Sequence, residues 1–433
     1  MEIEQLHKIY TRSRKVTTDS RNISEGCLYF ALKGEKYDGN KFAEQALNSG
    51  ASLAIIDNSD FYLDERTVLV SNALETLQDL ANYHRVKLQI PIIGITGSNG
   101  KTTTKELMNA VLSAKYKVLA TKGNQNNHLG VPLTLLSITP DIEIAIIEMG
   151  ANHPYEIEFL CMIAEPTHAI ITNIGKAHLE GFGGFAGVIK TKKELYDFVS
   201  EKKGIIFYNS DDSLLSNMLP KGLVNKFSYG FKSGELCKGT IISSDPYVNI
   251  EILDTRNGKS EIVMSQLVGE YNAENILTAV CTGLYFSVPL SEIALAIGNY
   301  QPENNRSQLI DTGKNKVILD CYNANPSSTL ASLNNFEKMQ ADFKTVILGD
   351  MLELGDEAEV EHKNIIEFLL KLTSFQILLV GEHYQKLAEF YFITSFITAD
   401  DLKTWLKIHP ITNKLILVKG SRGIQLEKII DVL

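Results

Sequence analysis

Short apolar runs alternate with turn residues and helical stretches from the start of the chain. In the first block, residues 1–88, apolar runs lie at 27–32, 53–56 and 67–70, with a helical stretch near 42–47. Short apolar runs bounded by turn residues are typical of buried strands. The block contains no Gly-x-Gly-x-x-Gly string, which argues against a dinucleotide-binding start. The pattern predicts a small N-terminal α/β domain.

A longer alternation fills residues 89–305. Buried strands are expected at 90–96, 117–120, 142–148, 168–173 and 204–208. Because helical segments separate these runs, the pattern predicts a parallel sheet with helices on both faces. Residues 237–268 predict a small antiparallel insertion, and a helix over 272–285 closes this central domain.

The same alternation returns in residues 306–433. Strands are expected at 317–321, 345–348, 377–380 and 415–418. Each is followed by a helical pattern, which predicts a second doubly wound, Rossmann-like sheet in a C-terminal domain. The fold class expected for the whole chain is therefore α/β in three domains, at 1–88, 89–305 and 306–433.

Composition and charge narrow the functional classes. Lys and Arg number 42 against 52 Asp and Glu, so the net charge of −10 argues against a general nucleic-acid or anionic-membrane binder. The five cysteines form no Cys-x-x-Cys pair, which argues against a disulfide framework. The N-terminal stretch lacks the pattern of a signal peptide, and no apolar run approaches the roughly 18 residues of a membrane span. We expect a cytoplasmic protein without nucleic-acid or membrane partners.

The strongest chemical signal is the glycine-rich segment 94–104, between a predicted strand and a predicted helix. Glycines let several backbone N–H groups converge on one anion, and the helix N-terminus favours negative charge. Lys101 would neutralise phosphates, and the Thr102 hydroxyl would reach Mg²⁺. Ile95 stands where the strict phosphate-loop pattern has its first glycine, so the match is to the shorter Gly-x-x-Gly-Lys-Thr. The candidate nucleotide-binding residues are Gly97, Ser98, Asn99, Gly100, Lys101, Thr102 and Thr103.

Three weaker candidates follow along the central domain. Glu148 ends a predicted strand, where a carboxylate beside a phosphate loop can hold Mg²⁺. His178 follows another strand, and neutral imidazole is a ligand for divalent ions. Lys192 lies in a Lys-rich helical stretch, which on the residues alone is more typical of a solvated basic face. Glu148 equally fits an ordinary polar role, and a lone His after a strand is more often simply a satisfied polar residue.

Two further candidates lie near the junction with the third domain. Asn272 and Asn275 are three residues apart on a predicted helix and share a face. Their amides can recognise a base or ribose, or cap a helix. Arg306 opens the third domain, where it can act on a transferring phosphate or form an interdomain salt bridge.

Together these segments resemble the Mur ligase family, ATP-dependent enzymes that build the peptidoglycan precursor. The resemblance covers nearly the whole chain in the family's order. It rests on the phosphate loop, Glu148, His178, Lys192, Asn272, Asn275, Arg306 and Asp320.

Within the family, five segments are similar to the branch that adds D-alanyl-D-alanine to UDP-N-acetylmuramoyl-tripeptide. They are residues 123–127, 148–154, 320–326, 348–355 and 418–422. Residues 18–21, Thr-Asp-Ser-Arg, resemble the uridine-nucleotide-binding domain shared with the tripeptide-forming ligase. That neighbour's Asp-Asn-Pro-Arg motif does not occur here.

The resemblance implies a mechanism and a set of roles. ATP would phosphorylate the terminal carboxylate of the tripeptide, and the dipeptide amine would displace phosphate from the acyl phosphate. The catalytic residues it implies are Lys101, Lys192, His178 and Arg306, with Lys192 as a carbamate. The ligands it implies for Mg²⁺ are Thr102, Glu148, His178 and Lys192. Beyond the loop, the nucleotide contacts it implies are Asn272, Asn275, Arg306 and Asp320. The contacts it implies for the other substrates are Ser20, Arg21, Asn124, Asn126, Asn127, Asn323 and Asn325.

Two alternatives remain on the sequence. One is a phosphate-loop nucleotide switch, which as a GTPase would need an Asn-Lys-x-Asp guanine reader that is absent here. The other is a related amide ligase such as folylpolyglutamate synthase, which lacks the uridine-binding front domain. We expect a monomer whose substrates are small molecules. The third residue of the substrate peptide, lysine or meso-diaminopimelate, stays open, as do the dipeptide contacts.

Overall fold

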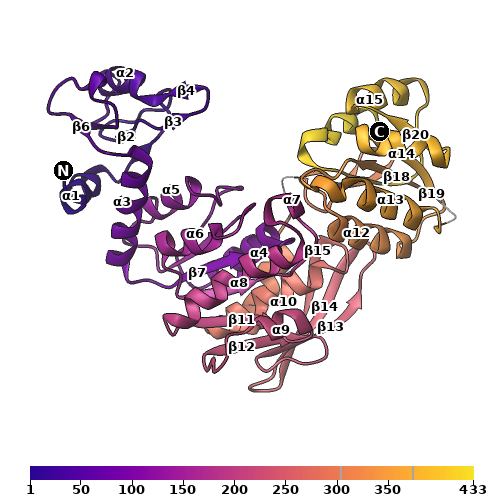
Figure 1. Ribbon diagram of the computed structural model, residues 1–433. Coiled ribbons are helices and arrows are strands. Elements are labelled where there is room, and N and C mark those ends of the chain that lie inside the picture. The colour runs from indigo at the N-terminus through magenta and orange to yellow at the C-terminus, as the bar shows by residue number, and fades with distance from the viewer. Residues whose placement is uncertain (303–304, 373–374) are drawn as a thin grey trace.

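The computed structural model describes residues 1–302, 305–372 and 375–433. Three α/β domains follow one another along the chain, and the N-terminal and C-terminal domains form two arms on either side of the central one (Figure 1). This arrangement confirms the expected three-domain α/β fold. In the described residues, no helix is long and apolar enough to cross a membrane.

The N-terminal domain is built on a parallel sheet in the order β1-β2-β5-β6. Its strands are β1 (Val16–Thr17), β2 (Leu28–Phe30), β5 (Leu53–Ile56) and β6 (Thr67–Leu69), with the short hairpin β3 (Lys33–Gly34) and β4 (Tyr37–Asp38). Its helices are α1 (Ile3–Ser13), α2 (Ala43–Asn48) and α3 (Ala73–Leu88). Asn72 caps α3 by accepting from the backbone of Leu74 and Glu75. The α3 side chains Gln78 and Arg85 donate to carbonyls of the central domain, so this helix joins the two domains.

The central domain holds a sheet in the order β15-β14-β13-β12-β11-β10-β7-β9-β8. The strands are β7 (Ile92–Thr96), β8 (Val118–Ala120), β9 (Ile144–Glu148), β10 (His168–Ile171), β11 (Ile205–Asn209), β12 (Lys226–Gly230), β13 (Cys237–Ser243), β14 (Tyr247–Asp254) and β15 (Lys259–Val268). The strands predicted within 90–208 are confirmed. The antiparallel segment within 237–268 is confirmed too, but it extends the same sheet through β13 instead of forming a separate insertion.

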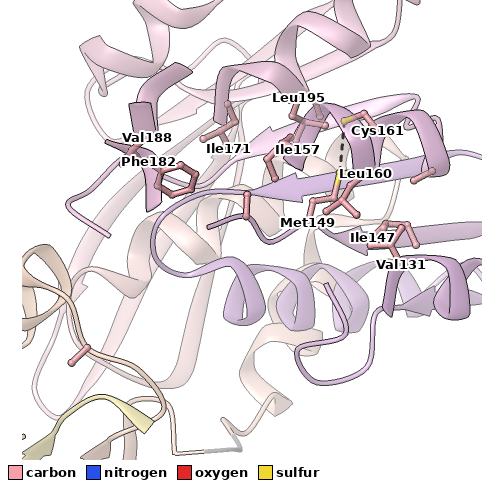
Figure 2. Packing of buried hydrophobic residues seen from close by; sticks show 14 of the residues in the cluster. Val131, Ile147, Met149, Ile157, Leu160, Cys161, Ile171, Phe182, Val188 and Leu195 are labelled. Carbon is pink, nitrogen blue, oxygen red and sulfur yellow. Dashed lines mark hydrogen bonds between the residues drawn. The ribbon is translucent and has the colours of Figure 1, made fainter. Parts of the chain in front are cut away.

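Helices cover both faces of this sheet, as the apolar strands predict. They are α4 (Lys101–Ser113), α5 (Gly130–Leu136), α6 (Glu156–Ala164), α7 (Leu179–Phe182), α8 (Phe185–Glu201), α9 (Ser213–Met218), α10 (Asn272–Tyr285) and α11 (Leu290–Asn299). Strand β9 is buried along its whole length. Its Ile147 packs with Leu160 of α6 and Val131 of α5 in one core (Figure 2), whereas Ile146 belongs to the core under α4 and α10. This two-sided packing fixes the end of β9 at the site.

The C-terminal sheet has the order β16-β17-β21-β18-β19-β20, parallel except for β16. Its strands are β16 (Gln308–Asp311), β17 (Lys316–Asp320), β18 (Lys344–Gly349), β19 (Phe375–Val380), β20 (Thr394–Phe396) and β21 (Leu415–Lys419). Its helices are α12 (Pro326–Lys338), α13 (Ala358–Leu369), α14 (Glu382–Tyr391) and α15 (Ala399–Ile408). The doubly wound sheet predicted for this region is confirmed. The carboxyl ends of β17, β21 and β18 lie side by side, where open α/β sheets bind ligands.

Candidate functional site

A cavity of about 810 Å³ lies between the central and C-terminal domains. Its central wall comes from the loop after β7 and from residues that follow β9 and β10. Its opposite wall comes from residues that follow β17, β18 and β21, such as Tyr322, Glu353 and Arg422. The carboxyl ends of two parallel sheets therefore face one space, and its volume suits small-molecule substrates.

The loop between β7 and α4 has the geometry of an anion cradle. Gly97 has φ 144° and Gly100 has φ 77°, conformations that L side chains rarely adopt. A Cβ at Gly100 would meet the Asn275 Oδ1 at 2.5 Å, and one at Gly97 would overlap the Thr172 hydroxyl. These glycines therefore allow the loop to lie close to its neighbours while α4 points its N-terminus at the cavity.

Lys101 begins α4 and lines the cavity. Its Nζ donates to the carbonyl oxygens of Gly97 at 2.8 Å and Ser98 at 3.3 Å. Burial lowers the pKa of Lys101, the nearby Glu148 opposes that shift, and Arg306 adds to it. A cation held in this way by its own loop is available to a bound phosphate.

Glu148, at the end of β9, is the carboxylate nearest to this loop. Its Oε1 accepts from the Thr102 hydroxyl at 3.3 Å and from the Asn126 amide at 2.9 Å. Its Oε2 is buried and accepts no hydrogen bond from the described residues, although the Lys105 Nζ lies 3.6 Å away. A carboxylate oxygen without a donor, next to a hydroxyl and a phosphate loop, fits Mg²⁺, which keeps several waters and shares substrate phosphates.

The other two predicted metal ligands, His178 and Lys192, have other partners. His178 Nδ1 lies 2.7 Å from Glu353 Oε2 of the C-terminal domain, and this hydrogen bond lowers the pKa of Glu353. Lys192 on α8 is buried, with its Nζ 5.4 Å from the Phe182 ring centroid, and does not line the cavity. Across the described ranges, no three His, Cys, Asp or Glu side chains form a metal-ligand group. Thr102 and Glu148 are thus the predicted ligands that the structure brings together.

Burial lowers the pKa of the Lys192 amine. Desolvation, with a smaller contribution from the charge of Lys101, lowers the pKa of Lys192 to about 7. Near neutral pH, a large fraction of this amine is therefore uncharged and nucleophilic.

The two predicted asparagines of α10 support the phosphate loop. Asn275 accepts from the Thr104 hydroxyl at 3.0 Å through the same Oδ1 that lies against Gly100. Its amide nitrogen donates to Asn272 Oδ1, and Asn272 donates to Val268. Both residues line the cavity, but their described contacts are with the protein.

Arg306 and Asp320 lie in the C-terminal wall. The Arg306 guanidinium stacks 3.6 Å from the centroid of the Tyr322 ring, and its buried Nε has no hydrogen-bond partner among the described residues. Asp320 accepts from the Lys419 Nζ at 2.7 Å and from the Ser332 hydroxyl at 3.2 Å. The charge of Asp320 is thus already balanced by Lys419. Arg306 has no carboxylate partner among the described residues.

Most of the predicted substrate contacts also reach the cavity. Those that line it are Asn124, Asn126, Asn127, Asn323 and Asn325. Asn325 caps α12 and donates to the Asn99 side chain at 2.7 Å, so it links the C-terminal domain to the phosphate loop. Ser20 and Arg21 do not line the cavity; they lie in the N-terminal domain, where Arg21 pairs with Asp19 at 2.9 Å.

The cavity also contains residues to which the sequence assigned no role. Among them are His128, Glu156, Tyr271, Tyr322, Glu353, Lys419 and Arg422. Lys419 ends β21 and Arg422 follows it, so the rule that ligands bind at the carboxyl ends of parallel strands would have indicated both. Glu353 follows β18, so the same rule would have indicated it, but not its partner His178, which lies in another domain.

Comparison with known proteins places the chain among characterised ligases. Family models match three segments: the Mur ligase family catalytic domain at 13–88, the Mur ligase middle domain at 95–283, and the Mur ligase glutamate ligase domain at 305–422. The UDP-N-acetylmuramoyl-tripeptide–D-alanyl-D-alanine ligases of Bacillus subtilis and Escherichia coli are each 32% identical over 96% of this chain, covering 92% and 93% of their own lengths.

Solved structures agree with these relatives. A crystal structure of MurF from Acinetobacter baumannii is 31% identical and superposes with a TM-score of 0.87, covering 96% of this chain and 92% of that one. A MurF ligase from Thermotoga maritima, solved in complex with ADP, shares the fold with a TM-score of 0.85 at 24% identity and covers 97% of both chains. The chain belongs to the Mur ligase family.

Proposed function

We propose that this chain is an ATP-dependent ligase that joins D-alanyl-D-alanine to UDP-N-acetylmuramoyl-tripeptide, giving the pentapeptide of peptidoglycan synthesis, ADP and phosphate. One observation carries the proposal: a phosphate loop and the carboxyl ends of a second α/β sheet line a single cavity. This arrangement suits a reaction in which a nucleotide and an incoming amine meet. The relatives named for this ligation match 96% of the chain, which supports the choice of substrates.

The first step activates a carboxylate, which is a poor electrophile at neutral pH. An oxygen of the tripeptide's terminal carboxylate attacks the γ-phosphorus of ATP, and the bond to the β–γ bridging oxygen breaks, releasing ADP. Two anions must approach each other, so positive charge is needed where negative charge gathers. Lys101 would exchange its loop carbonyls for phosphate oxygens, and Arg306 would face them from the other domain.

Thr102 and Glu148 are the residues that would hold Mg²⁺ beside the loop. The bound ion would neutralise phosphate oxygens during transfer. Asn126 and Lys105 would keep the Glu148 carboxylate oriented, since the Asn126 amide donates to its Oε1 and the Lys105 Nζ lies 3.6 Å from its Oε2.

The second step forms the amide. The neutral amine of the dipeptide attacks the carbonyl carbon of the acyl phosphate, the amine loses a proton, and the carbon–oxygen bond to phosphate breaks. Water would hydrolyse the acyl phosphate, so the domains must close around it. Several contacts already bridge the two domains here, among them Asn325 to Asn99, and the Lys176 Nζ to Glu361 Oε1 at 2.5 Å.

Lys192 is proposed to act as a carbamate. Its neutral amine would add to CO₂ and release a proton, which turns a buried cation into an anionic oxygen donor for a second Mg²⁺. The pKa near 7 supports this reaction, because only the uncharged amine attacks CO₂. His178 would join that site after leaving Glu353. Lys192→Ala is expected to lose activity that formate or acetate partly restores; a near-normal rate without rescue would contradict the role.

The N-terminal domain is the proposed site of the sugar nucleotide. Ser20 and Arg21 would contact the uridine nucleotide in the N-terminal domain, which places the sugar nucleotide on the arm opposite the C-terminal domain. We propose that the enzyme works as a monomer in the cytoplasm on small-molecule substrates, without nucleic-acid or membrane partners.

The testing experiment measures phosphate release from Mg-ATP. The expected result is release that requires both UDP-N-acetylmuramoyl-tripeptide and D-alanyl-D-alanine, and that Lys101→Ala abolishes. Equal release without the dipeptide would indicate a plain ATPase or another acceptor and would overturn the proposal.

A further inference from the structure

Two arginine side chains share the ring of Tyr322 in the C-terminal wall of the cavity. The Cζ of Arg306 lies 3.6 Å from the ring centroid, and the Cζ of Arg422 lies 5.6 Å from it. Both side chains line the cavity, and neither has a carboxylate within 4.0 Å among the residues described here. Cations on one ring gain from its π face but repel each other. Bound anions would offset the repulsion between these two guanidiniums.

The other charges of this wall are already balanced. Lys419 is paired with Asp320 at 2.7 Å, and Glu353 is paired with His178 at 2.7 Å. Within the described part of the C-terminal wall, Arg306 and Arg422 are the cations without an acidic partner. Ligand anions are therefore the groups that can neutralise them.

The two arginines differ in what they can reach. Arg306 is close enough to the phosphate loop for its charge to lower the pKa of Lys101, which assigns it to the transferred phosphate. Arg422 begins a short turn just after β21, is exposed, and belongs entirely to the C-terminal domain. Its planar fork has the geometry to bind one carboxylate through two parallel hydrogen bonds.

Resting on the proposed function, we propose that Arg422 binds the unreactive terminal carboxylate of D-alanyl-D-alanine and thereby positions the dipeptide amine. The dipeptide is a zwitterion, and its carboxylate needs a counter-charge, which the exposed and unpaired Arg422 offers in the C-terminal wall of the cavity. Tyr322, whose ring both guanidiniums share, keeps Arg422 beside Arg306, which would serve the phosphates. Arg422 is then a specificity-determining residue.

The test compares Arg422→Met with wild type, using two acceptors. One is D-alanyl-D-alanine and the other is D-alanyl-D-alaninamide, in which a neutral carboxamide replaces the carboxylate. The matched control is Arg66→Met, because Arg66 is an exposed arginine of the N-terminal domain, paired with Asp64 and far from this wall. Steady-state phosphate release gives kcat and KM for each acceptor, for ATP and for the UDP-tripeptide.

In the wild type and in Arg66→Met, kcat/KM for the amide is expected to fall about 10- to 100-fold below that for the dipeptide. In Arg422→Met, KM for the dipeptide is expected to rise by a similar factor, while discrimination against the amide shrinks to about 2-fold and KM for ATP stays unchanged. Undiminished discrimination in Arg422→Met, no discrimination in the wild type, or a raised KM for ATP or the UDP-tripeptide would overturn the assignment. Absence of any wild-type turnover with D-alanyl-D-alanine would instead refute the proposed function, on which the assignment of Arg422 rests.

Discussion

Removal of the Lys105 ammonium is expected to destabilise the central domain, because it leaves a buried carboxylate uncompensated. Lys105 and Glu148 are each only 2% exposed, and their charges lie 3.6 Å apart. The Lys105 Nζ also donates to the Gly123 carbonyl at 3.2 Å. Lys105→Met keeps the length of the side chain and removes both interactions.

The magnitude follows from what Glu148 retains. Breaking a buried ion pair by removing one partner costs about 3–5 kcal/mol. The lower end applies here, since Oε1 keeps its hydrogen bonds from Thr102 and Asn126 and the charge of Lys101 still acts on Glu148, while Oε2 loses the Lys105 ammonium 3.6 Å away. We therefore expect Lys105→Met to lower the free energy of local unfolding around β9 by about 3 kcal/mol.

Hydrogen exchange of the β9 amides, without nucleotide or metal, measures this free energy. Glu148→Gln removes the charge that Lys105 balances, so the double variant Lys105→Met with Glu148→Gln is expected to recover about half of the loss. A loss below about 1 kcal/mol in the single variant, or simple additivity in the double variant, would refute the reasoning.

Three other perturbations give distinct results. Gly100→Ala should weaken ADP binding by at least about tenfold in calorimetry, because a Cβ at φ 77° meets Asn275; unchanged affinity would contradict the loop geometry. Burial holds the pKa of Lys192 at about 7, below the ordinary lysine value of 10.5, so the folded state binds fewer protons between these values and stability rises with pH there. In CO₂-free buffer, Lys192→Met should therefore melt higher than wild type below pH 7, and the gap should close toward pH 10; a constant gap would oppose this. Small-angle scattering should show a smaller radius of gyration with all substrates bound, and an unchanged radius would count against domain closure.

The sequence was sufficient for those features that depend on local pattern. The run 142–148 predicts a buried strand ending in a carboxylate, and β9 has that form. The segment 97–103 predicts a loop that needs glycine, and the positive φ values of Gly97 and Gly100 show why. Such features depend on neighbours in the chain, so periodicity and turn chemistry reveal them.

Contacts between domains could not be predicted in this way. His178 was expected beside a metal, but in this arrangement it meets Glu353, which lies in another domain. Lys192 was compatible with a solvated face, and only the packing of α8 shows that it is buried and that its pKa is lowered. The Tyr322 ring brings Arg306 and Arg422 together although they are far apart in the chain. The His178 contact joins two domains, whereas the burial of Lys192 and the Tyr322 contacts depend on how distant segments pack within one domain.

The contact of the phosphate loop with the third domain shows how nucleotide binding and amine delivery can be coupled. Asn99 lies at the centre of the loop, where its backbone carbonyl accepts from Thr172 and Asn173 and its side chain accepts from Asn325. Asn325 also caps α12, so its position is tied to the start of that helix. A phosphate that shifts Asn99 must therefore shift or release α12, and the wall that carries Tyr322 follows, because a short connection joins it to the same helix. On the proposed function, closure of the C-terminal wall would in this way be linked to occupation of the loop, which would protect the acyl phosphate from water until the dipeptide is present.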